Sequence, residues 1–135
     1  MKNPMPVVDD YMARDLITFR PEDDIHSAVK VLLDERISGA PVVNEHGSLI
    51  GVLSKKDCLR VVYSASYYDD WGGRVRDYMS PGAVTIESGT DIIAAADRFL
   101  YSSFRRFPVT DHGRMIGQIS RHDILLALND QWGGG

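Results

Sequence analysis

The sequence predicts a mixed α/β (α+β) fold made of two β-α-β-β-α units that are related by a pseudo-two-fold axis. Three observations support this prediction. Val8 to Val62 aligns with Val75 to Leu128 across a single one-residue gap, each copy carries a helical stripe of apolar residues, and each carries a β-hairpin pattern. Because a unit of about 60 residues is marginal as a lone core, we expect the copies to bury apolar faces on each other.

Each copy begins with a short strand and a helix. In the first copy, Leu16 to Phe19 is apolar and ends before Pro21, which lacks an amide donor. Asp23 or Asp24 then caps a helix. Its apolar positions follow the i, i+3, i+4, i+7, i+8 spacing of a buried helical face, and the second copy repeats them. These positions are Ile25, Ala28, Val29, Leu32 and Leu33, and then Ile92, Ala95, Ala96, Phe99 and Leu100.

A hairpin and a last helix complete each copy. Ala40 to Val43 and Leu49 to Leu53 are β-rich runs, and Gly47 in the turn between them supplies a positive φ. Phe107 to Thr110 and Met115 to Ile119 repeat this hairpin. The apolar positions of the last helices are Cys58, Leu59, Val61 and Val62, and then Ile124, Leu125, Ala127 and Leu128.

The repeat sets the predicted domain boundaries. We expect a first unit over residues 1–66, a linker over 67–74, a second unit over 75–130 and a tail over 131–135. The region from Tyr63 to Gly73 is polar and aromatic, which suits a linker that packs across the two halves rather than a flexible tether.

Composition narrows the class of protein. A chain of 135 residues with 44% hydrophobic content is long enough for one folded domain with two halves. The net charge of −4 provides no global basic field, which disfavours binding to nucleic acid. No apolar run reaches the roughly 18 residues of a membrane span, and no targeting signal precedes Val8. The single Cys58 excludes an intrachain disulfide. We expect a soluble, cytoplasmic protein.

The two strand-to-helix junctions carry the sharpest local pattern. Ser54 and Asp57 in the first copy, and Ser120 and Asp123 in the second, place a hydroxyl and a carboxylate three residues apart. One interpretation is a capping box, in which the serine accepts from the third helical amide and the aspartate reaches back to the cap. The other is ligand binding, because a helix N-terminus favours phosphate and a carboxylate accepts hydrogen bonds from a ribose diol. The spacing alone leaves both open.

Taken together and in order, these motifs resemble a tandem pair of CBS domains, the regulatory unit also called a Bateman module. The resemblance covers Val8 to Leu128. The motifs that carry it are Asp10-Tyr11-Met12 and Asp77-Tyr78-Met79, Ile37 to Val43 with Phe107-Pro108-Val109, and the two junctions from Gly51 to Asp57 and Gly117 to Asp123. The resemblance implies a standalone CBS domain-containing protein whose two units pack through their sheets and form two clefts. It also implies adenosine-containing ligands such as AMP, ADP, ATP or S-adenosylmethionine, and homodimers that assemble four units into a flat disc.

The resemblance also implies roles for individual residues. Asp57 and Asp123 would hold ribose hydroxyls, with Ser54 and Ser120 near phosphate. The Asp123 cleft would further use Ile37, Ser38, Gly39 and Ala40 for adenine, and Arg105 or Arg106, Arg121 and His122 for phosphates. The Asp57 cleft would use Lys55 or Lys56, with adenine against Phe104 to Phe107. Since arginine suits bidentate phosphate contact, we expect the more highly charged ligand at Asp123.

Two functions follow as expectations. The first is a regulatory module that senses an adenine nucleotide, with or without magnesium, and acts in trans on a protein effector. The alternative is a protein interaction module whose clefts stay unoccupied. An enzyme is disfavoured, because no nucleophile with an orienting base, no catalytic carboxylate pair and no metal-ligand set is recognisable in the sequence. We expect no resident cofactor, no nucleic acid partner and no membrane insertion.

Overall fold

The computed structural model describes residues 5–133, so residues 1–4 of the predicted first unit and 134–135 of the predicted tail lie outside the described residues. The chain forms two compact units. We call residues 17–83 the central unit, and residues 5–16 together with 84–133 the terminal unit, because the latter contains both ends of the described chain. Each unit contains one three-stranded sheet, in agreement with the predicted α+β class.

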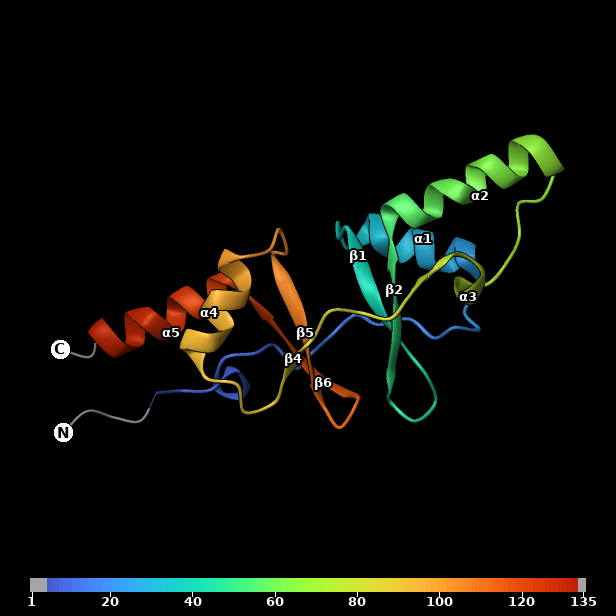
Figure 1. Cartoon of the computed structure of the whole chain (residues 1–135). Helices are drawn as coiled ribbons and strands as arrows, with labels where there is room; N and C mark the ends of the chain where they lie inside the picture. Colours follow the sequence, from blue (N-terminus) through green and yellow to red (C-terminus); the bar gives the residue numbers. More distant parts are fainter. Residues whose placement is uncertain (1–4, 134–135) are drawn as a thin grey trace. The chain divides into compact units, whose positions relative to one another are not determined.

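The central unit packs two helices with a small sheet of order β1-β2-β3 (Figure 1). Both strand pairs are antiparallel. The elements in chain order are α1 (Ile25–Asp34), β1 (Gly39–Val43), β2 (Leu49–Ser54), α2 (Lys55–Tyr68), α3 (Val75–Tyr78) and β3 (Ser80–Pro81). The core is formed by apolar side chains from all parts of the unit, including Ile25, Leu32, Val42, Leu53 and Val75.

Local sequence signals explain where these elements begin. Asp24 is the residue that caps α1, since its carboxylate accepts from the amide of Ser27 at 3.0 Å. Gly47 adopts a φ of 80° in the β1-β2 turn, as the hairpin pattern predicts. The predicted strand from Leu16 to Phe19 is shorter than expected, because only Phe19 pairs, in a parallel bridge with Val42.

The terminal unit repeats this arrangement (Figure 1). Its sheet has the order β4-β5-β6, with β4 parallel to β5 and β5 antiparallel to β6. The elements are η1 (Val8–Asp10), β4 (Ile86–Glu87), α4 (Ile92–Leu100), β5 (Arg106–Asp111), β6 (Arg114–Ser120) and α5 (Arg121–Gly133). Helix α5 thus continues past residue 130, where the sequence predicts a tail. Its core includes Val8, Ile86, Phe107 and Ile119.

The packing units differ from the sequence repeats. Residues 5–16 open the first repeat but pack on the hairpin of the second, where Ala13 pairs with Gln118. The carboxylate of Asp9 fixes this segment further by accepting from Ser88 Oγ and from the amide of Gly89. In the central unit the equivalent segment is β3, whose Ser80 pairs with Val52 of β2. The opening segment of each repeat therefore completes the unit that contains the other repeat's hairpin.

This exchange predicts how fragments of the chain behave. Residues 17–83 contain the complete central unit, whereas residues 1–66 lack the buried Val75 and Tyr78 as well as β3. We expect fragment 17–83 to unfold cooperatively, with the low stability of a chain of about 60 residues, and fragment 1–66 to stay largely unfolded. Circular dichroism during urea titration of both fragments checks this expectation. Equal cooperativity of the two fragments would contradict it.

Helix α2 is longer than the sequence analysis predicts. Residues up to Tyr68 remain helical, and Asp69 ends the helix in the left-handed conformation with a φ of 53°. Tyr63 and Tyr67, which were interpreted as part of a linker, lie one turn apart on this helix with their ring centroids 4.5 Å apart. The segment from Lys55 to Tyr68 contains no glycine or proline, so nothing in it stops the helix.

An apolar groove lies between α1 and α2. Leu33 was predicted to be buried but is 62% exposed, and Leu59 of α2 is 65% exposed. Together with neighbouring side chains they line a cavity of about 350 Å³. Its lining residues are His26, Val29, Leu32, Leu33, Lys55, Cys58, Leu59, Val61, Val62 and Trp71. The apolar stripe of α1 is therefore wider than the part that the core of the central unit covers.

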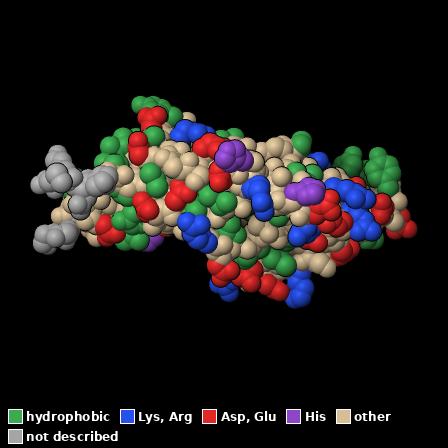
Figure 2. Space-filling view, turned by 90° about the horizontal axis from the view of Figure 1, so that it is seen from below, with side chains coloured by type: hydrophobic (Ala, Val, Ile, Leu, Met, Phe, Trp, Pro, Cys, Tyr) green, Lys and Arg blue, Asp and Glu red, His purple; other side chains and the backbone are tan. Residues whose placement is uncertain are grey.

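The surface carries mixed charge. Figure 2 shows one face of the molecule, on which lysine and arginine side chains are interspersed with aspartate and glutamate side chains. This distribution agrees with the small net charge of −4. Among residues 5–133, we find no helix with the length and apolar character needed to cross a bilayer.

Candidate functional site

Both predicted serine–aspartate pairs form reciprocal capping boxes. At the start of α2, the Ser54 amide donates to Asp57 Oδ2 at 2.9 Å and the Asp57 amide donates to Ser54 Oγ at 3.0 Å. At the start of α5, the corresponding Ser120 and Asp123 bonds measure 2.9 and 3.2 Å. The capping interpretation is therefore correct at both junctions. In each pair one carboxylate oxygen, Oδ2, is used by the cap, which leaves Oδ1 for other partners.

The loop before each hairpin also contacts the first helical turn. The Lys55 amide donates to the Ser38 carbonyl at 2.8 Å, and the Arg121 amide donates to the Arg105 carbonyl at 3.2 Å. Two of the first three amides of each helix, at the first and third positions, are thus already bonded within the protein. These amides are therefore not free to donate to a phosphate.

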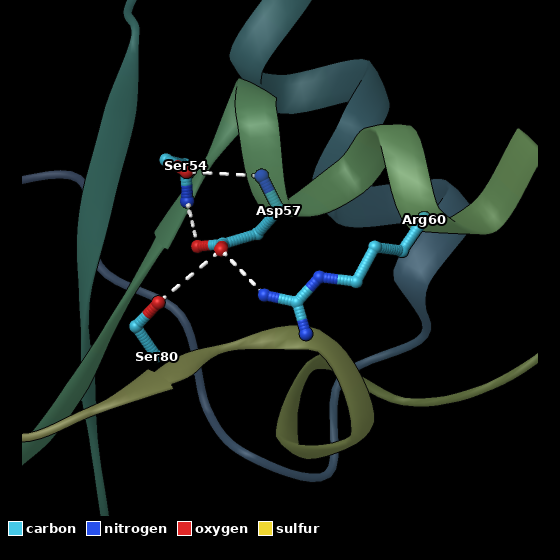
Figure 3. A network of polar contacts seen from close by, with 4 residues as sticks. All are labelled: Ser54, Asp57, Arg60 and Ser80. Carbon is cyan, nitrogen blue, oxygen red and sulfur yellow. Dashed lines mark hydrogen bonds and ion pairs between the residues drawn. The ribbon is translucent and has the colours of Figure 1, made fainter. Parts of the chain in front are cut away.

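Asp57 is the centre of a closed polar network (Figure 3). Its Oδ1 accepts from Ser80 Oγ at 3.2 Å and from Arg60 Nη2 at 3.1 Å, in addition to the Ser54 amide on Oδ2. The residue is only 7% exposed. Ser80 reaches it from β3, whereas Arg60 reaches it from the next turn of α2. Every bond that Asp57 accepts comes from the central unit.

Asp123 has a different environment. It is half-buried, and within residues 5–133 its Oδ1 takes part in no hydrogen bond or ion pair. Three exposed arginines belong to the same unit: Arg105, Arg106 and Arg121. None of them forms an ion pair with a carboxylate in the described part of the chain, although Arg121 Nε donates to the Phe104 carbonyl at 3.2 Å. Among residues 5–133, the terminal unit thus contains both an acceptor without a protein donor and cations without anionic partners.

The remaining predicted ligand residues are divided between the units. Ile37 and Ser38 precede β1 and Gly39 and Ala40 begin it, so they belong to the central unit with Ser54, Lys56 and Asp57. Lys56 is exposed in the first turn of α2, and His122 is exposed in the first turn of α5. The terminal unit contains Ser120, Arg121, His122, Asp123, Arg105 and Arg106. Ligand contacts by these residues stay predictions.

A family profile decides the identity of the duplicated architecture. The profile for the CBS domain matches residues 8–64 and again residues 75–130, which together form most of the chain. The chain belongs to the CBS domain family. The match confirms the resemblance found in the sequence, and it identifies the chain as a CBS pair.

Two relatives match most of this chain. The chain is 26% identical to the chloroplastic CBS domain-containing protein CBSX2 of Arabidopsis thaliana over 154 residues, which covers 93% of this chain and 65% of that protein. It is 27% identical to the uncharacterized protein MJ1225 of Methanocaldococcus jannaschii over 125 residues, covering 93% of this chain and 44% of the relative. The chain therefore spans less than two thirds of these relatives' lengths.

Solved structures show the same fold. A crystal structure of CBSX2 in complex with AMP has a TM-score of 0.75 and 28% identity, and covers 90% of this chain and 95% of that one. A second CBSX2 structure, described as a CBS-pair protein from Arabidopsis thaliana, has a TM-score of 0.77 and 27% identity, with 96% and 97% covered.

Sequence reasoning missed two residues of the Asp57 network in this CBS pair. Ser80 lies 23 positions after Asp57, so no local pattern links them. Arg60 lies one turn after Asp57 on α2, and the (i, i+3) spacing of the two residues was a readable signal for an ion pair. The repeat alignment also held a clue, since Asp57 and Asp123 match while Arg60 aligns with Leu126.

Cys58 has a packing role beside this network. Burial, and then the neighbouring Asp57 carboxylate, raise the pKa of its thiol. The thiol is therefore protonated at neutral pH, and the side chain packs against the core of the central unit. Within the described chain, no group of three or more histidine, cysteine, aspartate or glutamate side chains has an arrangement suited to a metal ion.

Proposed function

We propose that this CBS pair is a regulatory module that binds an adenine nucleotide through the terminal unit and acts in trans on a protein effector. The observation that supports this proposal most directly is Asp123, whose Oδ1 lacks a donor among residues 5–133 while the cap holds its Oδ2. The capping box fixes the carboxylate at the start of α5, so it is positioned before any ligand arrives.

The chemistry of this group suits a nucleotide. A carboxylate oxygen with two open lone pairs accepts hydrogen bonds from the two adjacent hydroxyls of a ribose. Arg105, Arg106 and Arg121 supply guanidinium groups without anionic partners, and such groups bind phosphate in a bidentate manner. Ser120 and His122 lie next to them in sequence at the same helix start. The relative CBSX2 was crystallised with AMP, which supports adenosine-containing ligands as the class to test.

Regulation requires that binding favours one state of the protein. A nucleotide shifts an equilibrium only by the difference between its binding free energies to the two states. We propose that the pair works as a homodimer in the cytoplasm and transmits the shift to a separate effector, without catalysing a reaction itself. In a homodimer, a nucleotide bound to one chain changes the surface that both chains present to the effector.

Binding of ATP, ADP, AMP, adenosine and S-adenosylmethionine tests the proposal. We expect at least one of these ligands to raise the melting temperature of the chain, because it binds the folded state. Asp123→Ala should weaken that affinity by at least about tenfold, which is about 1.4 kcal/mol. Asp91→Ala is the matched control, since it removes the cap of α4 in the same unit without touching Asp123. Equal weakening by both variants would contradict a role for Asp123 in binding.

The arginines have their own variant. Changing Arg105 and Arg106 to alanine together should abolish any preference for ATP over adenosine, because only the phosphates distinguish these ligands. Arg114→Ala removes an exposed arginine from β6 and serves as the control. Isothermal titration calorimetry with ATP and adenosine measures the preference. A preserved preference would show that the phosphates bind elsewhere.

A second candidate function is protein docking, and the groove between α1 and α2 favours it. This groove is lined mainly by apolar side chains and includes the exposed Leu33, Leu59 and Trp71. Exposed apolar surface of this kind often marks an interaction site. If no adenosine-containing ligand binds at millimolar concentration, docking becomes the better account of the module.

A further inference from the structure

We infer that Ser80 and Arg60 close the Asp57 carboxylate to ligands, so that the chain binds one nucleotide, at Asp123. The inference rests on the proposed function and specifies which of the two equivalent carboxylates performs it. From sequence the two carboxylates look interchangeable, since both follow a serine at the start of the last helix of a repeat. Their hydrogen-bond partners differ.

The two carboxylates differ in the hydrogen-bond partners of one oxygen, Oδ1. At both positions, Oδ2 accepts the amide of the capping serine, at 2.9 Å. At Asp57, Oδ1 also accepts from Ser80 Oγ and from Arg60 Nη2, which occupies both of its lone pairs. At Asp123, Oδ1 accepts no bond from residues 5–133. A ribose diol would therefore have to displace two donors at Asp57 and none at Asp123.

The repeat shows why the two positions differ. The alignment that matches Met12 with Met79 also matches Ala13 with Ser80, and the one that matches Asp57 with Asp123 matches Arg60 with Leu126. Strand pairing in the structure supports the match of Ala13 with Ser80 without use of the alignment. Ser80 pairs with Val52 of β2 in the central unit, and Ala13 pairs with Gln118 at the equivalent place in β6.

Both side-chain donors to Asp57 Oδ1 are thus replaced by apolar residues in the terminal unit. Neither the methyl group of Ala13 nor the side chain of Leu126 is able to donate a hydrogen bond. Leu126 is 43% exposed, so the terminal unit has room at this position for a longer side chain. Two substitutions in each direction therefore exchange the polar environments of the two carboxylates.

The exchange provides the experiment. Calorimetric titration of the full chain with AMP and with ATP measures the number of sites per chain. We expect one site in the unmodified protein, and at least tenfold weaker binding at that site in Asp123→Ala. Ser80→Ala combined with Arg60→Leu gives Asp57 the neighbours of Asp123, and should raise the stoichiometry from one to two. A stoichiometry that stays at one in this folded double variant overturns the inference while leaving the proposed function intact.

The reverse pair of substitutions tests the inference whether or not the variant with Ser80→Ala and Arg60→Leu is stable. Ala13→Ser combined with Leu126→Arg gives Asp123 the neighbours of Asp57, and should lower the affinity for AMP at least tenfold. Unchanged affinity in this folded variant overturns the inference, as does a stoichiometry of two in the unmodified protein. If the unmodified protein binds neither nucleotide, the proposed function is refuted and the inference with it. The other contradicting outcomes refute the inference alone, so the two kinds of failure are distinguishable.

Discussion

Asp57→Ala is expected to lower the free energy of unfolding by about 2 kcal/mol, whereas Asp123→Ala should lower it by only about 1 kcal/mol. Both substitutions remove one capping box, which contributes on the order of 1 kcal/mol. Only the first also leaves Ser80 Oγ and the Arg60 guanidinium without their acceptor, next to a site that is 7% exposed. The exposed Arg60 head group contributes little by itself, because water screens its ion pair.

Urea-induced unfolding of the two variants measures the difference. The slope of the free energy against urea concentration should stay the same, since neither substitution alters the surface exposed on unfolding. Asp24→Ala is a useful reference, because Asp24 caps α1 in the same unit as Asp57 and accepts only from Ser27 and not from a distant side chain. If Asp57→Ala and Asp24→Ala have equal effects, the network around Asp57 adds nothing beyond the cap.

Gly51→Ala is expected to lower the free energy of unfolding by about 2 kcal/mol. A β-carbon at this position would lie 2.6 Å from the carbonyl oxygen of Ser80 and 3.2 Å from Met79 Sδ. The sulfur belongs to a flexible side chain, but the carbonyl belongs to β3, whose pairing with β2 is fixed at Gly51 and Val52. Relief of the clash therefore requires a shift of this strand, which also carries Ser80 away from Asp57.

The control for this variant lies in the same unit. A β-carbon at Gly72 would meet only Asp70 Oδ1, at the ordinary contact distance of 3.6 Å. Gly72→Ala should change the melting temperature by little, because an exposed substitution without a clash is close to neutral. Thermal unfolding of both variants by calorimetry checks the contrast. A Gly51→Ala protein as stable as Gly72→Ala would show that β3 moves without cost.

Much of the fold was predictable because its signals are local. The helical stripes, the aspartate caps of α1 and α4, and the glycine at the β1-β2 turn each depend on residues within one turn or hairpin of each other. The reciprocal serine–aspartate bonds belong to the same class, because a serine and an aspartate three residues apart are the pattern of a capping box, one of the two interpretations that the spacing allows.

The remainder depends on contacts between residues far apart in sequence. Periodicity marks Leu33 as apolar but does not reveal that no part of the central unit covers it. The bond from Ser80 to Asp57 joins β3 to α2. Ser80 belongs to the second repeat and Asp57 to the first, and an alignment of the two repeats does not show that these residues meet. The candidate site was therefore predictable as a pair of equivalent positions, while the difference between them required the structure.

The exchanged opening segments have a consequence for synthesis of the chain on the ribosome. The central unit is contiguous and ends at residue 83, so all of its parts have emerged while the last repeat is still being translated. The segment around Val8 is made before the central unit, but its partners in β6 and at Thr90 are made after it. We expect residues 17–83 to fold first during translation, while the segment around Val8 stays unpaired until β6 has been made.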